Sequence, residues 1–288
     1  MKKTPNVTAI LRSLLPRKKE EEVNRIEEER RYILSKGSDF FIREAYKALR
    51  TNVMFSLADE EGCRVVVVTS AMKSEGKSIS AVNLAISFAE MNSKVLVVDC
   101  DLRRPKLGRL LQMNSKLGLS NVLLDPELLE GAIQKSTVAN MDVLTAGDIP
   151  PNPSELLGSS RMHKLLANLR QKYDYIILDT SPINMVTDAC VLVPESNGVL
   201  FVVRANRTER DAVAHALGQL EYSKAKVLGF VLNGAGAEYG RYSKYRYGKY
   251  RRYGYGYGYG YGGYGYGYGY GYGYGYQPRI GEMPEREG

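Results

Sequence analysis

The sequence has no tryptophan, only two histidines and only three cysteines among its 288 residues. Cys63, Cys100 and Cys190 are widely spaced and form no CxxC pair, which excludes a disulfide framework and predicts reduced thiols. His163 and His215 lack the spacing of metal ligands. The sequence also lacks an apolar run of the roughly 18 residues that a membrane-spanning helix needs, and its basic N-terminus does not fit a signal peptide. These absences predict a cytoplasmic protein.

Tyrosine and glycine are instead concentrated near the C-terminus. Residues 239–276 hold 17 of the 22 tyrosines and 14 of the 29 glycines, with six basic residues and no acid. Because residues 277–288 carry a net charge of −1, the last 50 residues contribute +5 of the net +8. A chain that alternates Tyr and Gly cannot bury enough surface to order itself, so we expect a flexible tail over 237–288. The uneven charge argues against a protein that coats nucleic acid, and no specific nucleic-acid partner is expected.

Apolar strand-like runs alternate with helical patterns through most of the remaining sequence. The runs predict strands over 64–70, 94–99, 141–146, 175–179, 199–204 and 226–233, and helices over 38–55, 77–92, 154–171 and 208–222. Continuous β-branched runs such as 65–68 are typical of strands buried on both faces. The pattern predicts an α/β domain over 38–236, with a mostly parallel sheet and helices on both faces. Residues 1–37, dense in both charge signs, are expected to form an N-terminal extension.

The first predicted strand runs into a phosphate-binding loop. Residues 71–78 read AMKSEGKS and fit the Walker A pattern GxxxxGK[ST], except that Ala71 occupies the first glycine position. In this P-loop NTPase motif the backbone N–H groups surround the phosphates of ATP, Lys77 reaches the outer phosphates, and the Ser78 hydroxyl binds Mg²⁺. Asn233, at the end of the last strand, is either an adenine contact or a strand-end cap. The expected nucleotide-binding residues are therefore Lys73, Ser74, Glu75, Gly76, Lys77, Ser78, Ile79 and Asn233.

Two further predicted strands end in carboxylates. Asp99 and Asp101 share one side of an extended chain, and Asp179 ends the strand over 175–179 as a Walker B candidate. Ligands bind beyond the carboxyl ends of strands in open α/β sheets, where these acids would lie. A structural alternative remains for each of two acids, helix capping by Asp101 and strand termination by Asp179. We expect Ser78, Asp101 and Asp179 to hold Mg²⁺ directly or through water.

Several motifs, in their order along the chain, resemble those of the bacterial tyrosine kinases. VLVVDCDLRRP (95–105) is similar to the Walker A′ motif of that family, and YIILDTSP (175–182) is similar to its Walker B motif. EAYKALRTN (44–52) resembles the EX2RX2R helix, with Lys47 in place of the first arginine. GDIPPNPSELL (147–157) and the terminal tyrosine cluster complete the set. The resemblance covers about residues 38–255, and it implies that Glu44, Lys47 and Arg50 take part in ring-like self-association.

The resemblance implies an ATP- and Mg²⁺-dependent protein-tyrosine autokinase that regulates capsule or exopolysaccharide synthesis. The chain is similar to the cytoplasmic type, which a separate membrane-spanning protein of the polysaccharide co-polymerase type activates and recruits to the inner face of the plasma membrane. A homo-oligomeric ring, a tyrosine phosphatase and exogenous protein substrates are further expected partners. The candidate catalytic residues are Lys77, Asp99, Asp101 and Arg103.

Phosphoryl transfer requires positioning and charge neutralisation, and a phenol of pKa near 10 needs a base. We expect Asp99 to accept the proton, although Asp99 and Asp101 could exchange roles. Arg103 either stabilises the transferred phosphate or makes a surface salt bridge.

Tail tyrosines are the expected acceptors, with transfer between subunits, because packing of the helix around Glu44 against a neighbour would hinder the tail from reaching its own site. The expected acceptors are Tyr242, Tyr245, Tyr247, Tyr250, Tyr253 and Tyr255. Two alternatives remain open. The chain could be a Min/Par-type nucleotide-switch ATPase that releases free phosphate, or an interaction or scaffold protein driven by Arg–Tyr contacts of the tail.

Overall fold

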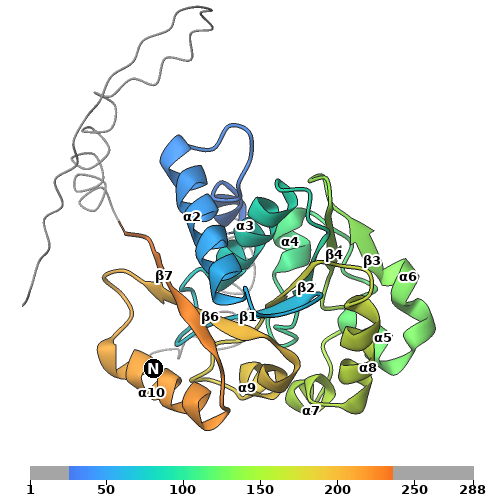
Figure 1. Cartoon of the computed structure of the whole chain (residues 1–288). Coiled ribbons are helices and arrows are strands. Elements are labelled where there is room, and N and C mark those ends of the chain that lie inside the picture. The colour runs from blue at the N-terminus through green and yellow to red at the C-terminus, as the bar shows by residue number, and fades with distance from the viewer. Residues whose placement is uncertain (1–25, 236–288) are drawn as a thin grey trace, which may run out of the picture. The chain divides into compact units, whose positions relative to one another are not determined.

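Seven strands form one sheet in the part of the chain that the computed structural model describes, residues 26–235 (Figure 1). The strands are β1 (Arg64–Ser70), β2 (Val95–Asp99), β3 (Ile133–Lys135), β4 (Met141–Leu144), β5 (Tyr175–Asp179), β6 (Gly198–Arg204) and β7 (Val227–Asn233). Their order is β3-β4-β2-β5-β1-β6-β7, and every pair is parallel except β3 with β4. The predicted α/β fold with a mostly parallel sheet is confirmed.

The central strands are buried on both faces, which explains their unbroken apolar sequences. In β1, Val65 and Val67 pack into one hydrophobic cluster, whereas Val66 and Val68 pack into the other. Successive side chains of a strand point to opposite faces, so a strand between two helical layers needs apolar residues at every position. All four valines are fully buried.

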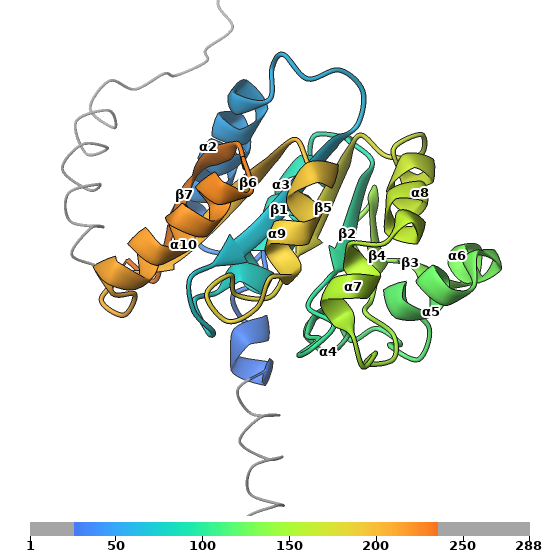
Figure 2. The same cartoon turned by 90° about the horizontal axis from the view of Figure 1, so that it is seen from below.

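Helices cover both faces of the sheet (Figures 1 and 2). On one face lie α2 (Phe40–Ser56), α3 (Lys77–Ala89) and α4 (Leu107–Leu111), whose buried residues join the cluster of Val66 and Val68. The other face packs against α5 (Leu119–Leu124), α6 (Leu129–Ala132), α7 (Pro153–Leu157), α8 (Ser160–Leu169), α9 (Asp188–Leu192) and α10 (Arg210–Tyr222). Two short 3₁₀ turns, Pro126–Leu128 and Val193–Glu195, complete the described elements.

Several predicted bounds shift by one to three residues, one predicted helix is divided, and short elements appear that the sequence did not predict. The helix expected over 154–171 is divided into α7 and α8, because the Ser159 side chain caps a new helix by accepting a hydrogen bond from the Met162 backbone N–H. The antiparallel edge strand β3 was not predicted, since three residues are too few to show a period.

The C-terminal ends of the strands bring the candidate carboxylates together. Asp99 of β2 lies in register beside Asp179 of β5, and Val68 of β1 pairs with Asp179 on its other side. The chain leaves β1 at Ser70 and enters the loop that leads to α3. The topology therefore places the loop of residues 71–76 next to both acids.

Part of the charged N-terminal segment packs against α3. Residues 26–30 are helical, and the Leu34 side chain is buried. The Asn83 side chain of α3 accepts a hydrogen bond from the Leu34 backbone N–H at 2.8 Å and donates one to the Tyr32 carbonyl at 2.8 Å. The Asn83 side chain thus pairs with the backbone of this segment through one accepted and one donated hydrogen bond. The division of the chain into domains stays a prediction.

The rest of the predicted N-terminal extension and the tail of 237–288, with its six expected acceptor tyrosines, lie outside the described residues. Across residues 26–235, the structure contains no helix of the length and apolar character that crossing a membrane requires.

Candidate active site

The loop between β1 and α3 is shaped by a glycine and an asparagine. Gly76 has a φ of 96°, in the left-handed region, and a Cβ at this position would lie 1.8 Å from Nδ2 of Asn233. The same Nδ2 donates a hydrogen bond of 2.9 Å to the Glu75 carbonyl. No side chain caps the N-terminus of α3, so its first N–H groups remain available to phosphate oxygens. Asn233, predicted as an adenine contact or a strand-end cap, supports the loop from the end of β7.

The buried Glu75 side chain links the loop to Thr208. Its carboxylate is 1% exposed and accepts hydrogen bonds from the Thr208 hydroxyl at 2.6 Å and from the Met72 backbone N–H at 3.0 Å. The other predicted loop residues differ in exposure: Lys73 is exposed, Ser74 and Ile79 are half-buried, and Ser78 is buried. The side chains of Glu75 and Asn233 thus hold the loop in place.

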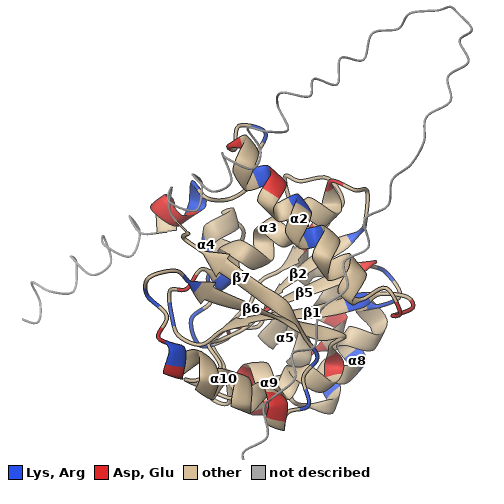
Figure 3. Ribbon diagram, turned by 60° about the vertical axis from the view of Figure 1, so that its left-hand side comes forward, with Lys and Arg blue, Asp and Glu red and all other residues tan. Residues whose placement is uncertain are grey.

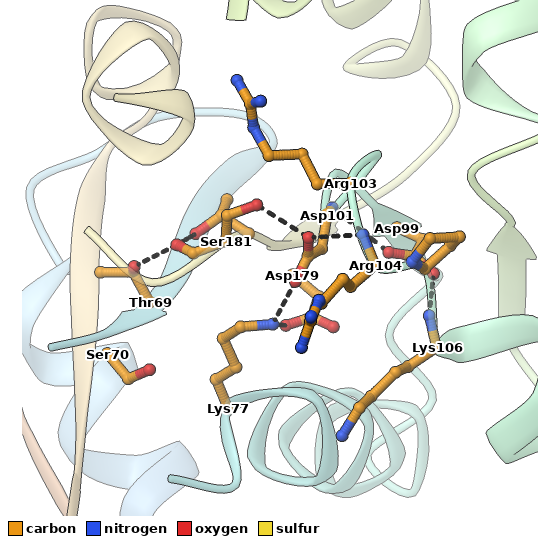
Figure 4. A network of polar contacts seen from close by, with 12 residues as sticks. Thr69, Ser70, Lys77, Asp99, Asp101, Arg103, Arg104, Lys106, Asp179 and Ser181 are labelled. Carbon is orange, nitrogen blue, oxygen red and sulfur yellow. Dashed lines mark hydrogen bonds and ion pairs between the residues drawn. The ribbon is translucent and has the colours of Figure 1, made fainter. Parts of the chain in front are cut away.

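Lys77 lies between two carboxylates at the start of α3. Its Nζ donates to Oδ2 of Asp101 at 2.9 Å and lies 3.6 Å from Oδ1 of Asp179 (Figure 4). Burial lowers the pKa of the Lys77 ammonium, but Asp179 and Asp101 more than offset this and raise the pKa above its usual value. The three predicted residues are brought together, with the lysine fully charged at neutral pH.

Asp99 lies deeper than Asp101 and holds the segment that follows β2. Its Oδ2 accepts backbone N–H groups of Lys106 at 3.0 Å and Leu107 at 2.9 Å, and its Oδ1 accepts that of Asp101 at 3.3 Å. Burial and the charge of Asp179 raise the pKa of Asp99 from 3.8 to about 7. Asp99 is fully buried, whereas Asp101 is 6% exposed.

Asp179 is a buried carboxylate that lies beside Lys77 and Ser78. Neither of its buried oxygens has a short hydrogen-bond partner among residues 26–235; the Lys77 ammonium lies 3.6 Å from Oδ1, and the Ser78 hydroxyl also interacts with the carboxylate. Burial raises the pKa of Asp179, and the ammonium of Lys77 opposes that rise. A buried carboxylate with free acceptor positions is typical of a cation site.

The donor set suits magnesium better than a metal held by protein ligands alone. Across residues 26–235, no three His, Cys, Asp or Glu side chains are arranged as a metal cage. Mg²⁺ keeps several waters and binds through one or two carboxylates together with substrate phosphates. Of the three expected ligands, Ser78, which is 5% exposed, and Asp179 fit that requirement, whereas the Asp101 oxygens accept from Lys77, Ser181 and the Arg104 backbone N–H.

Arg103 does not face the phosphate-binding loop. Its Nε and Nη2 donate to the two oxygens of Asp188 at 2.9 and 3.1 Å, and in Figure 4 its side chain extends away from Lys77. Asp188, at the start of α9, is fully buried. The sequence left two roles for Arg103, contact with the transferred phosphate or a surface salt bridge. The structure shows a salt bridge, in which Arg103 is paired with a buried carboxylate.

Ser181 and Asp188 were missed by the sequence reasoning. Ser181 donates to Oδ1 of Asp101 at 2.8 Å and lies 3.1 Å from Oδ2 of Asp188. Its position two residues after the Walker B acid was a usable signal. Asp188 gave none, because its contact with Arg103 joins residues 85 apart in the sequence.

The residues implied in self-association lie on α2 and make contacts within the chain. Lys47 donates to Glu44 at 2.7 Å, and Nη1 of Arg50 donates to the Ser87 carbonyl of α3 at 2.6 Å. Figure 3 shows charges of both signs along α2. The side chains of Lys47 and Glu44 are 41% and 37% exposed, so they remain accessible, whereas Arg50 is anchored to α3.

Comparisons with known proteins cover the residues around Lys77. A family model described as an AAA domain matches residues 63–222, which include Lys77, Asp101 and Asp179. Tyrosine-protein kinase YwqD of Bacillus subtilis (strain 168) is 40% identical over 204 residues, 71% of this chain and 85% of that protein.

Two solved structures are similar in sequence and in fold. The kinase domain of the Escherichia coli tyrosine kinase ETK gives a TM-score of 0.64 at 35% identity, over 67% of this chain and 75% of that one. The chimerical protein CapA2B2 gives a TM-score of 0.65 at 35% identity, over 69% of this chain and 86% of that one.

Proposed function

The chain belongs to the bacterial tyrosine kinases, and we propose that it is an autokinase that transfers the γ-phosphoryl group of ATP to tyrosines of its own C-terminal segment. The system that it regulates makes capsular or extracellular polysaccharide. One observation carries the proposal: Lys77 lies 2.9 Å from Asp101 and 3.6 Å from Asp179 beside an uncapped helix N-terminus. The sequence adds 17 tyrosines over 239–276 as acceptors.

The residues of the loop bind and orient the phosphates. The N–H groups at the start of α3 donate hydrogen bonds to the anionic oxygens of the phosphates, and Lys77 exchanges its carboxylate partners for the outer phosphates. Ser78 and Asp179 would hold Mg²⁺, which neutralises charge on the phosphates during transfer. Gly76 keeps the backbone close enough for these contacts, since any Cβ there would meet Asn233.

Asp101 is the better placed proton acceptor of the two acids that the sequence left interchangeable. The oxygens of Asp99 accept three backbone N–H groups, so a phenol reaches them only if the segment 101–107 moves. Asp101 is 6% exposed and also accepts three hydrogen bonds, but the one from Lys77 is released when that ammonium turns to the phosphates. In the transfer, the phenol oxygen bonds to the γ-phosphorus, the bond to the bridging oxygen of ADP breaks, and the phenol proton passes to Asp101.

The partner is a separate membrane-spanning activator of the polysaccharide co-polymerase type, which recruits the chain to the inner face of the plasma membrane. The similarity to the chimerical protein CapA2B2 supports this expectation. Glu44 and Lys47 offer a charged, accessible surface on α2 for a neighbouring copy in a ring. A tyrosine phosphatase would reverse the modification, and exogenous protein substrates are expected in addition to the tail.

Labelled ATP tests the reaction directly. The full chain should place phosphate on tyrosine, as identified by phosphopeptide mass spectrometry, and Lys77→Met should abolish the signal. Lys94→Met is the matched control, because Lys94 is exposed just before β2, at the opposite end of the strands, and should leave the signal unchanged. Release of free phosphate without phosphotyrosine would contradict the proposal and favour the nucleotide-switch ATPase. Phosphate on neither would favour the scaffold alternative.

A further inference from the structure

The hydrogen bonds and ion pairs of the site continue from Asp101, through Ser181, to another buried carboxylate, Asp188. Three donors besides Ser181 saturate it: Nε of Arg103 at 2.9 Å, Nη2 of Arg103 at 3.1 Å, and the Ser154 hydroxyl of α7. A planar guanidinium that meets both oxygens of a carboxylate makes a strong, geometrically fixed pair. Ser154 belongs to the segment GDIPPNPSELL, to which the chemistry so far assigns no task.

Ser181 lies between the two carboxylates and has only one proton to share. Its hydroxyl is 2.8 Å from Oδ1 of Asp101 and 3.1 Å from Oδ2 of Asp188. A serine hydroxyl donates a single hydrogen bond, so it binds one carboxylate or the other at any moment. The side that receives the proton is therefore decided by how well each carboxylate is satisfied by its other donors.

The Ser181 proton matters for the orientation of Asp101. Oδ2 of Asp101 accepts from Lys77 at 2.9 Å, while Oδ1 accepts from Ser181 and from the Arg104 backbone N–H at 3.1 Å. When Lys77 turns to phosphate, the contacts on Oδ1 are the ones that keep the carboxylate in place. Without Ser181, one backbone N–H alone would hold Asp101.

We propose that Arg103 is a positioning residue, which saturates Asp188 so that the single proton of Ser181 stays on Asp101. The proposal rests on the proposed kinase function and gives Arg103 a role without contact to the transferred phosphate. The Arg103 side chain extends away from Lys77 in Figure 4, in agreement with this role. Ser154 adds a further donor to Asp188 and links α7 to the same network.

The consequence of losing Arg103 follows from the burial of Asp188. A buried carboxylate that loses its charged partner is strongly unsatisfied and draws on the nearest remaining donor. Ser181 then turns from Asp101 to Asp188, and Asp101 loses its orientation. If Asp188 is replaced by Asn at the same time, the competing negative charge is gone and the proton returns to Asp101.

Steady-state phosphorylation by the full chain tests this competition. Arg103→Met should lower kcat by about tenfold or more, in line with the cost of a misplaced catalytic group, and should change the KM for ATP by no more than about twofold. The double variant Arg103→Met/Asp188→Asn should recover most of the lost kcat. Asp142→Asn is the matched control: it alters a buried carboxylate of β4, which is bonded to Lys135 of the edge strand β3, and it should neither change kcat nor rescue Arg103→Met.

A second pair of variants separates positioning from general support of the fold. In the Ser181→Ala background there is no proton to redirect, so adding Arg103→Met should cause no further loss of kcat. Thermal unfolding identifies variants that are not folded at the assay temperature. If Arg103→Met is not folded, Arg103→Lys replaces it, since lysine keeps the charge without the bidentate contact. Its smaller loss of kcat should likewise vanish in Ser181→Ala.

Two results would overturn the proposal. If Asp188→Asn fails to restore kcat in Arg103→Met, Arg103 contacts the phosphate directly. If Arg103→Met lowers kcat equally in the Ser181→Ala background, the Ser181 proton does not explain the effect. A wild-type chain that forms no phosphotyrosine would refute the proposed function instead. In that case the same variants are compared by ATP hydrolysis, so the positioning proposal is still decided.

Discussion

Asp99 and Asp179 show how burial governs the carboxylates of this site at the scale of single residues. Burial is the largest influence on both, and it raises the pKa of each carboxyl from its ordinary value of 3.8. The two lie in register on neighbouring strands, so each charge also disfavours the other. The ammonium of Lys77 lowers the pKa of both carboxyls and so opposes these effects.

Replacing Asp99 by Asn should change how stability depends on pH. The pKa of Asp99 is about 7 in the folded chain, above its ordinary value of 3.8, so the folded state binds the proton more tightly. Its contribution to stability is complete below pH 3.8 and is lost as the pH rises through about 7. Relative to the wild type, Asp99→Asn should therefore gain stability as the pH rises from 3.8 to about 7, and the difference should level off above that. Urea unfolding at a series of pH values measures this difference.

An unchanged difference between the two proteins across that pH range would contradict the assignment. Asp179 contributes with the same sign, since burial also raises its pKa, so some slope should remain in Asp99→Asn. Activity is recorded in parallel, because the three backbone contacts of Asp99 hold the segment that carries Asp101.

The residues that could be predicted are those fixed by short patterns. Lys77, Ser78, Asp99, Asp101 and Asp179 lie at strand ends or in one loop, where the order of the chain determines position. Asp188, the partner of Arg103, could not be predicted. The two residues are 85 positions apart, and no periodic pattern or sequence motif links them. The second task of Asn233, supporting the loop, likewise depends on how closely β7 approaches Gly76.

At the scale of elements, α3 is the organising helix. Its N-terminus faces the loop, its Ser87 carbonyl accepts Arg50 of α2, and its Asn83 side chain holds the segment around Tyr32 and Leu34. All but one of its residues are buried, so its packing depends on both neighbouring helices and on the sheet.

Asn83→Ala should destabilise the chain by about 1–3 kcal/mol, since the Leu34 N–H and the Tyr32 carbonyl then lose their partner. The urea midpoint measures the change in the free energy of unfolding. Asn52→Ala is the control, because Asn52 lies on the exposed side of α2 and should cost much less. Equal effects of the two substitutions would show that residues 32–34 contribute nothing through Asn83.

The elements themselves followed from apolar runs where the runs were long. The bounds of β1 and β5 agree with the sequence prediction, because each is an unbroken apolar stretch that ends in a polar residue. The division between α7 and α8 was not predicted, since both helices continue the same apolar face and only the cap at Ser159 separates them.

At the scale of the whole molecule, the central question is which subunit modifies which tail. The catalytic groups lie at one edge of the sheet, while the tyrosines of 239–276 follow β7 in the sequence outside the described residues. Glu44 and Lys47 are accessible on α2 to a second copy. Each phosphate adds about −1.5 to −2 charge, so a few would cancel the +5 of the last 50 residues.

Mixing two defective chains tests transfer between subunits. A full-length Lys77→Met chain has acceptor tyrosines but lacks the phosphate-binding ammonium, whereas a chain without residues 237–288 keeps the site and lacks the tail. Only transfer from one chain to the other can place phosphate on the Lys77→Met tail. We expect phosphotyrosine on that tail in the mixture and none in either chain alone, as measured by mass spectrometry of tail peptides.

The Lys77→Met chain must be shown to be folded, because the substitution removes the cation between two buried carboxylates. Its loss leaves Asp101 and Asp179 without their shared cation, so thermal unfolding of Lys77→Met must show that the chain is folded before it serves as an acceptor. If it is not, Lys77→Arg keeps the charge and replaces it. Phosphotyrosine that appears in the active full-length chain but never on the Lys77 variant would mean that each subunit modifies its own tail. The charge of each tail would then be reversed by the active site of the same chain, and no ring would be needed for it.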